Sequence, residues 1–487
     1  MMILATTPVA LFASEGQSHI IEPSPWMIIP FVLLLLAIAV MPFINKHWWE
    51  HYYPHVAVGL GLITITYYVA FLGNPVRMLH SGIEFFSFLC LVGSLFVVAG
   101  GMHINLKGYA TPIKNTMMLL FGAVISNLIG TTGASMILIR PYMRNNRNRL
   151  KAFHVIFFIF IVSNIGGALT PIGDPPLFLG YLKGVPFFWV IENVWHIWLL
   201  AIVLILLVFI VFDTLDYRKM PKEQRDRENE VADVTRLDGM HNLAFLLLIL
   251  IAVFIQNPPF VREAIMIAAA VGSYLTTKKT VHAANDFNFL PIKEVGFLFL
   301  GLFATMVPAL DWLELNAASI GITSAGQFFW GTGVLSSFLD NAPTYLNFLS
   351  ASIGLFVDQS LVVQVNDIIK AGSHATLGQY PVEVQQTFQT LFKYHGDLVA
   401  SGHVPLDDIN ISYLIGVHPI YLISISVAAV FFGANTYIGN APNFMVKSIA
   451  EQAGAKMPSF FGYMFRYSIP ILIPIFILVW LLFFFHS

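Results

Sequence analysis

The chain has 487 residues, of which 57% are hydrophobic and 11% charged, with a net charge of −2 at pH 7. An ordinary soluble domain carries about 25% charged residues, so this composition excludes that class. The small net charge gives no electrostatic footprint for nucleic acid, and the single cysteine excludes a disulfide framework. Apolar stretches of membrane-spanning length recur, so we expect an all-α polytopic membrane protein.

In chain order, residues 1–25 form an N-terminal segment, either a weak signal peptide or an interfacial segment. Two later apolar stretches, 116–139 and 328–350, have polar centres that contain Gly or Pro. They are typical of re-entrant hairpins, because irregular backbone at membrane depth must be buried in protein or line a watery cavity. About ten transmembrane helices complete the expected fold: 26–44, 54–73, 84–104, 152–182, 187–214, 241–256, 260–277, 291–310, 412–446 and 459–486.

The distribution of Lys and Arg predicts the orientation. If both ends of the hairpin 116–139 face the cytoplasm, the inner loops hold 20 of the 25 basic residues. The hairpin 328–350 then enters from outside, and both termini lie outside. Residues 215–240 become a cytoplasmic linker and residues 351–411 an external insertion. The expected location is the bacterial inner (plasma) membrane.

The two halves, 26–214 and 241–486, repeat the same order of three spans, a hairpin, a broken span and a final span. Five crossings in each half predict two repeats of inverted topology. Such repeats place a transport site near the bilayer midplane, between hairpin tips and broken helices. The positions that we match by sequence are Ser126 with Asp340, Asn127 with Asn341, Thr170 with Thr436, and Asp174 with Asn440.

Two carboxylates, Asp174 and Asp340, lie in these interrupted segments, and neither segment contains Arg or Lys. An ionisable group at membrane depth is a functional candidate because its burial is costly. Carboxylates without cationic partners attract cations and can exchange them for protons. The structural alternative is that both residues only cap helices. The nearby Asn and Thr side chains have a similar alternative, since they can bond freed backbone.

Four motifs resemble the NhaD-type sodium/proton antiporters, a branch of the ion transporter superfamily that also holds arsenite, citrate and dicarboxylate carriers. These motifs are SNLIGTTGAS (126–135), SNIGGALTPIGDPPLFLG (163–180), SSFLDNAP (336–343) and GANTYIGNAPN (433–443). The resemblance implies two re-entrant hairpins, two cation sites and a homodimer. In the carboxylate carriers both tips carry a Ser-Asn-Thr pattern. Here Asp340 stands in the second tip and Leu128 interrupts the first, which favours a cation.

Carried over by this resemblance, the residues expected to bind cations or protons are Ser126, Asn127, Thr131, Asn164, Thr170 and Asp174 at one site, and Ser337, Asp340, Asn341, Asn435, Thr436 and Asn440 at the other. We expect Na⁺ (or Li⁺) to be exchanged for protons by alternating access, with Asp174 and Asp340 as the Na⁺ ligands and with no resident cofactor.

Three alternatives remain at this point. The first is a Na⁺-coupled citrate or dicarboxylate transporter, and the second is an oxyanion or arsenite exporter. The third, a membrane enzyme, is disfavoured because the sequence has no HExxH, serine-nucleophile or phosphate-loop motif.

Overall fold

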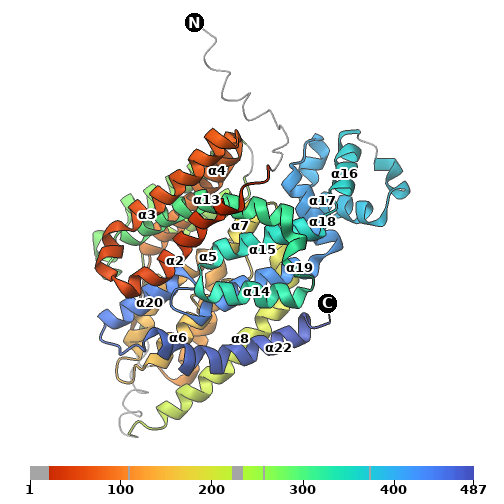
Figure 1. Ribbon diagram of the computed structural model, residues 1–487. Coiled ribbons are helices and arrows are strands. Elements are labelled where there is room, and N and C mark those ends of the chain that lie inside the picture. Colours follow the sequence, from red (N-terminus) through yellow and green to blue (C-terminus); the bar gives the residue numbers. More distant parts are fainter. Residues whose placement is uncertain (1–20, 108–109, 222–233, 256–257, 372–373, 487) are drawn as a thin grey trace.

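Figure 1 shows the computed structural model of the chain, which describes residues 21–107, 110–221, 234–255, 258–371 and 374–486. Among these residues, seven helices are long and apolar enough to cross a membrane, or up to nine if each of two bent pairs is one span. The expected all-α polytopic membrane fold is confirmed. Residues 1–20, where the signal or interfacial segment is predicted, lie outside the described residues.

One group of helices, the first bundle, packs around α13. Phe88 of α4 stacks on Phe299 of α13 with ring centroids 4.7 Å apart, and Ser87 donates to Glu263 of α11 at 2.6 Å. The first bundle consists of α2 (Ile29–Ile44), α3 (Lys46–Thr66), α4 (Pro75–Gly100), α10 (Asn242–Val253), α11 (Val261–Thr276) and α13 (Leu290–Asn316). Its short connecting elements are η1 (Pro25–Ile28), η2 (Tyr67–Phe71), α12 (Lys279–Ala284) and η4 (Ala317–Ile320).

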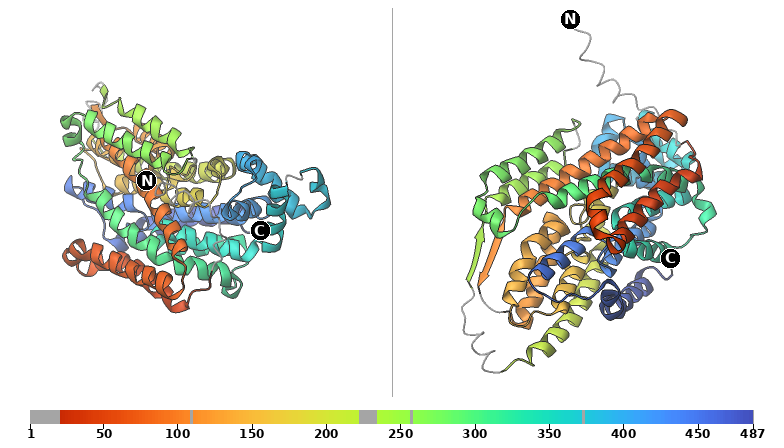
Figure 2. Two further views of the ribbon diagram at one scale, coloured as in Figure 1. Left: turned by 90° about the horizontal axis from the view of Figure 1, so that it is seen from above. Right: turned by 60° about the vertical axis from the view of Figure 1, so that its left-hand side comes forward.

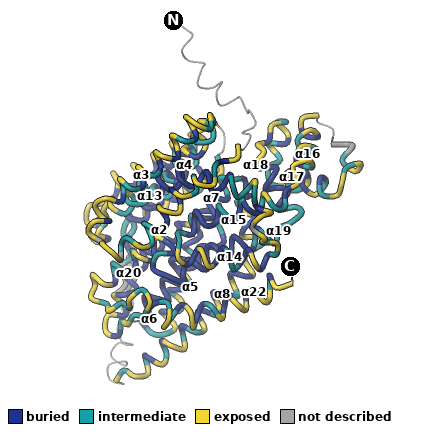
Figure 3. Tube along the Cα trace, in the orientation of Figure 1, coloured by how far each residue is buried: buried dark blue, intermediate teal, exposed yellow. Residues whose placement is uncertain are grey.

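A second bundle contains the interrupted segments. Figure 3 shows buried residues gathered in the middle of the molecule around α5, α14 and α15. The apolar helix α6 is buried along its whole length, so its end lies deep in the protein. The second bundle consists of α5 (Pro112–Asn145), α6 (Ala152–Ile161), η3 (Ile165–Gly167), α7 (Pro175–Leu182), α8 (Phe187–Tyr217), α14 (Ala325–Phe338), α15 (Asn341–Phe356), α19 (Pro419–Phe432), η6 (Gly433–Asn435), α20 (Ala441–Gln452), α21 (Phe460–Tyr463), η7 (Met464–Leu472) and α22 (Ile473–Phe483).

The expected insertion 351–411 is helical and projects from one side of the molecule (Figures 1 and 2). Its elements are α16 (Gln359–Ala371), η5 (His374–Gln379), α17 (Val382–Ser401) and α18 (Leu406–Val417). The axis of α18 is bent 102° from the following helix. The expected broken span 412–446 therefore contains a sharp bend near its start, between Val417 and Pro419. His418, which precedes this proline, is non-helical at φ −130°.

Two short strands were not predicted. β1 (His103–Lys107) pairs antiparallel with β2 (Val234–Asp238), which lies in the expected linker 215–240. In the right-hand view of Figure 2 the two arrows lie side by side. Asn285 anchors the start of β1, donating to the Gly100 carbonyl at 2.9 Å and to the Met102 carbonyl at 2.8 Å. The linker is thus tied back to the first bundle.

Candidate functional site

The helix α5 is a hairpin rather than a straight span. Gly130 has φ 77° and ψ 154°, which interrupts its 34 residues. The two ends of α5 meet, because the Ala110 amide donates to the Asn145 carbonyl at 3.2 Å and the Asn115 side chain donates to Asn146 at 2.8 Å. By length and composition, α5 qualifies as a single membrane-spanning helix. These contacts show instead that its two arms fold back on each other.

The helices α14 and α15 form a second hairpin around Leu339 and Asp340. Their arms lie against each other, since the Phe328 ring contacts the rings of Phe348 and Phe356 at centroid distances of 6.1 and 5.9 Å. We call α5 the first hairpin and α14–α15 the second hairpin. Both stretches expected as hairpins therefore fold back in the structure.

Two unwound segments face these tips. The first break, residues 162–174, follows α6, and the second break, residues 433–440, follows α19. In the first, a Cβ at Gly167 would lie 2.7 Å from the Gly173 carbonyl oxygen. In the second, a Cβ at Gly439 would lie 2.6 Å from the Gly433 carbonyl oxygen. Each break folds over itself so tightly that only glycine fits at these positions.

The hairpins and breaks are joined by the same hydrogen bonds in both halves. The Thr170 hydroxyl donates to the Asn127 carbonyl, and the Thr436 hydroxyl donates to the Ser337 carbonyl, each at 2.6 Å. Each threonine oxygen also accepts from a glycine amide at 3.1 Å: Thr170 from Gly173 and Thr436 from Gly439. Asn127 thus corresponds to Ser337.

This bonding corrects the register that we matched by sequence. The hydroxyls of Ser126 and Ser336 both donate to backbone carbonyls near the start of a break, Val162 directly after α6 at 2.8 Å and Ala429 near the end of α19 at 2.6 Å. Ser126 therefore corresponds to Ser336, and not to Asp340. The sequence match aligned identical asparagines, whereas backbone bonding aligns the helical turns that precede each tip.

Asp174 lies where both tips and both breaks meet. It is 1% exposed, and its carboxylate accepts hydrogen bonds from the Thr131 hydroxyl at 2.8 Å and from the Asn440 amide at 2.9 Å. The Asn341 amide donates to its other oxygen. None of the described Lys, Arg or His side chains bonds to it. Asp174 makes no side-chain capping bond to α7, so the cap alternative does not explain its burial.

Asp340 has a different environment. It is half-buried, and its side chain accepts from the Ala342 amide at 3.0 Å. Asp340 is therefore the N-cap of α15, and this bond to Ala342 is the helix-capping role that the sequence left open as an alternative. Thr131 and Asn341, on opposite tips, are bridged by Asp174, whereas Asp340 makes no hydrogen bond to either among the described residues.

Most other predicted residues bond the unwound backbone. Asn127 donates to the Gly166 carbonyl at 2.7 Å and accepts from the Leu169 amide at 2.9 Å. Asn435 donates to the Ser337 hydroxyl at 2.9 Å. Among the predicted site residues, three buried side-chain oxygens accept no hydrogen bond from any described group, those of Asn164, Asn341 and Asn435. The interrupted segments thus gather amide oxygens and one carboxylate.

Residues 21–484 match the profile of a protein family described as "Putative citrate transport". The chain belongs to this family. The match covers both hairpins and both breaks, and it identifies the protein as an ion transporter-type integral membrane protein. No curated protein matches the chain. The finer assignment of this family member to the NhaD-type antiporters stays a prediction.

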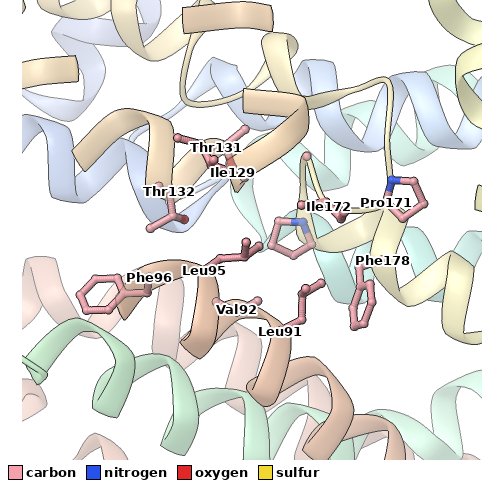
Figure 4. A pocket seen from close by; sticks show the side chains of 14 residues that line it. Leu91, Val92, Leu95, Phe96, Ile129, Thr131, Thr132, Pro171, Ile172 and Phe178 are labelled. Atoms are coloured by element: carbon pink, nitrogen blue, oxygen red, sulfur yellow. The ribbon is translucent and has the colours of Figure 1, made fainter. Parts of the chain in front are cut away.

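A small cavity lies beside the first tip of this transporter (Figure 4). It has a volume of about 30 Å³ and separates α4 of the first bundle from the tip and the first break. Leu91 and Leu95 line one wall, and Thr131 and Ile172 line the other (Figure 4). The volume suffices for water. The interface between the two bundles therefore contains a small gap beside Thr131, which bonds to Asp174.

The sequence did not predict a buried charged network at the base of the first hairpin. Arg149 contacts Asp213 and donates to the Ala110 carbonyl at 3.0 Å. The Asp213 carboxylate also lies 3.0 Å from His154 Nε2 and accepts from Asn115 at 2.8 Å. Arg149 was interpreted only as an inner-loop charge, and Asp213 sits inside an apolar run. This network fixes the hairpin ends to α8.

Asn443 is the second residue that the sequence reasoning missed. It is fully buried and contacts both breaks. The sequence signal for Asn443 was its place at the end of the motif GANTYIGNAPN, directly after Pro442 in the first turn of α20.

Proposed function

We propose that this transporter exchanges Na⁺ (or Li⁺) for protons by alternating access, with Asp174 as the group that binds either the cation or the proton. The observation that carries the proposal is the buried Asp174 carboxylate, which has three neutral donors and no cationic partner among the described residues. An isolated buried carboxylate is costly unless it is neutralised or paired. A bound cation or a bound proton meets that requirement.

The surrounding oxygens suit a hard cation. Na⁺ prefers oxygen ligands, as Ca²⁺ and Mg²⁺ do. The unpartnered amide oxygens of Asn164, Asn341 and Asn435 lie in the two breaks and the second tip. The Asn341 amide bonded to Asp174 can turn its oxygen inward when a cation replaces the hydrogen bond. Asp340, which lies next to Asn341, is proposed as the second carboxylate that attracts the cation.

We also propose that residues 26–214 and 241–486 are inverted repeats, with both termini outside. The matched bonds of Thr170 and Thr436 to the two hairpins support the repeat. The meeting ends of α5 support a hairpin that enters and leaves on one side of the membrane. A homodimer in the bacterial inner membrane completes the proposal and rests on the resemblance to the antiporters.

A second candidate function is Na⁺-coupled transport of citrate or a dicarboxylate. The family description favours it. Among the described residues, no Arg or Lys bonds to Asp174 or to the amides that surround it, so a bound carboxylate would depend on Na⁺ and on neutral donors. This candidate therefore requires Na⁺ at the same site, and it differs in what moves with the cation.

Purified protein in liposomes that contain a pH dye tests both functions. Addition of Na⁺, Li⁺, K⁺ or Na⁺ with labelled citrate separates the candidates, because exchange moves protons without citrate and symport accumulates citrate. We expect Na⁺ and Li⁺ to drive proton flux, and we expect Asp174→Asn to abolish it. Asp367→Asn, an exposed carboxylate on α16, is the matched control. Full Na⁺-dependent flux in Asp174→Asn would exclude the proposed role.

A further inference from the structure

Asn443 connects the two unwound segments through a fully used side chain. Its amide donates to the carbonyls of Gly433 and Thr436, each at 2.9 Å. Its side-chain oxygen accepts from the Asn164 amide at 2.6 Å. Gly433 and Thr436 belong to the second break and Asn164 to the first, so one buried side chain holds both breaks.

These bonds determine which way the Asn164 amide faces. Its nitrogen donates one hydrogen to the Ile159 carbonyl at 2.8 Å and the other to Asn443. Both donors are therefore used, and the acceptor on Asn443 excludes the flipped amide, since two oxygens would then face each other. The Asn164 oxygen is left without a donor, although it is fully buried.

The free oxygen lies beside the second tip. A Cβ placed on Gly433 would lie 3.1 Å from the Asn164 oxygen and 3.5 Å from the Asn341 amide nitrogen. That same Asn341 nitrogen bonds to Asp174. The Asn164 oxygen and the Asp174 carboxylate are thus linked through the Asn341 amide.

We propose that Asn443 is a positioning residue that keeps the Asn164 oxygen turned toward the transported cation. This inference rests on the proposed cation exchange. In this proposal Asn443 is not a ligand of the ion: its amide hydrogens bond the second break, and its oxygen accepts from Asn164. Its role is to orient a ligand and to hold the second break in the shape that the ligand requires. Outer residues of this kind commonly set metal affinity.

The test compares Asn443→Leu with the wild type in the same liposomes, using Na⁺ alone and Li⁺ alone. We expect the half-saturating concentration of Na⁺ to rise roughly 10- to 100-fold, as for other residues that orient ligands. We also expect the Li⁺ to Na⁺ ratio of these concentrations to change, because ligand geometry selects between ions. Asn193→Leu is the matched control, since the Asn193 amide donates to the Trp189 carbonyl of its own helix α8 and lies outside the hairpins and the breaks.

A second variant covers failure of Asn443→Leu to fold. Gly433→Ala leaves Asn443 intact and crowds the Asn164 oxygen, so we expect a changed ratio. A wild-type ratio in Gly433→Ala would overturn the role, as would a wild-type ratio in a folded Asn443→Leu. Absence of Na⁺- or Li⁺-driven flux in the wild type would instead refute the proposed function.

Discussion

The tip of the first hairpin should be sensitive to one added methyl group, at Gly130. Its φ of 77° and ψ of 154° fall in a region that essentially only glycine occupies. Gly130→Ala therefore costs about 1–3 kcal/mol of backbone strain. The new Cβ would also lie 3.3 Å from the Ile172 carbonyl oxygen, which is a tight contact. The next residue, Thr131, donates its amide to Gly173 and its hydroxyl to Asp174, each at 2.8 Å.

If the tip relaxes, Thr131 moves away from Asp174. A strain of about 1–3 kcal/mol corresponds to a roughly 5- to 150-fold shift toward the relaxed tip. We expect ion flux in liposomes to fall by a factor in that range, with a lower midpoint of thermal unfolding in detergent. Gly82→Ala is the control, because Gly82 is exposed on α4 and a Cβ there meets no atom within 4 Å. Wild-type flux and wild-type unfolding in Gly130→Ala would refute this reasoning.

Three further predictions concern charged residues. Asp340→Asn should preserve the cap of α15 but reduce ion exchange, whereas Asp340→Ala should also lower the stability by about 1 kcal/mol. If Asp340→Asn and the wild type show equal flux, Asp340 acts only as a helix cap. Arg149→Ala should destabilise the protein by about 3–5 kcal/mol because it removes the guanidinium that pairs with the buried Asp213 carboxylate, which keeps His154 and Asn115 as partners. Arg149→Met combined with Asp213→Asn should recover much of the loss in detergent unfolding, and an unaffected single variant would contradict this view. Protons should compete with Na⁺ for Asp174, so the half-saturating Na⁺ concentration should rise as the pH falls, approaching about tenfold per unit; a pH-independent value would exclude competition.

Much of the helical architecture follows from apolar length alone. The basic residues that flank 116–139 predicted that this stretch folds back, and the meeting ends of α5 agree. Hydrophobicity does not determine where a helix bends, so the end of α18, residues 412–417, was included in the broken span 412–446. It also does not reveal five-residue strands: β2 lies in the polar linker 215–240, and β1 begins at the end of the expected span 84–104.

The candidate site was predicted by residue type but not by partner. All three donors to Asp174, namely Thr131, Asn341 and Asn440, were among the predicted residues. Their convergence depends on two tips and two breaks that are distant in the sequence, and spacing alone cannot give it. Asn443 was missed for the same reason, since a polar residue one turn into a helix is ordinary until its partners are known.

The corrected register changes what distinguishes the two halves. The separation in sequence that relates Ser126 to Ser336 also relates Thr131 to Asn341, and both of these donate to Asp174. The two tips therefore contribute equivalent donors, and the halves differ where Asp174 corresponds to Asn440 and where, by the same separation, Gly130 corresponds to Asp340. Because that Asn440 amide itself bonds to Asp174, a nearly symmetric frame encloses one carboxylate. The buried Asp174 carboxylate, surrounded by neutral hydrogen-bond donors, favours a site that one cation or one proton neutralises.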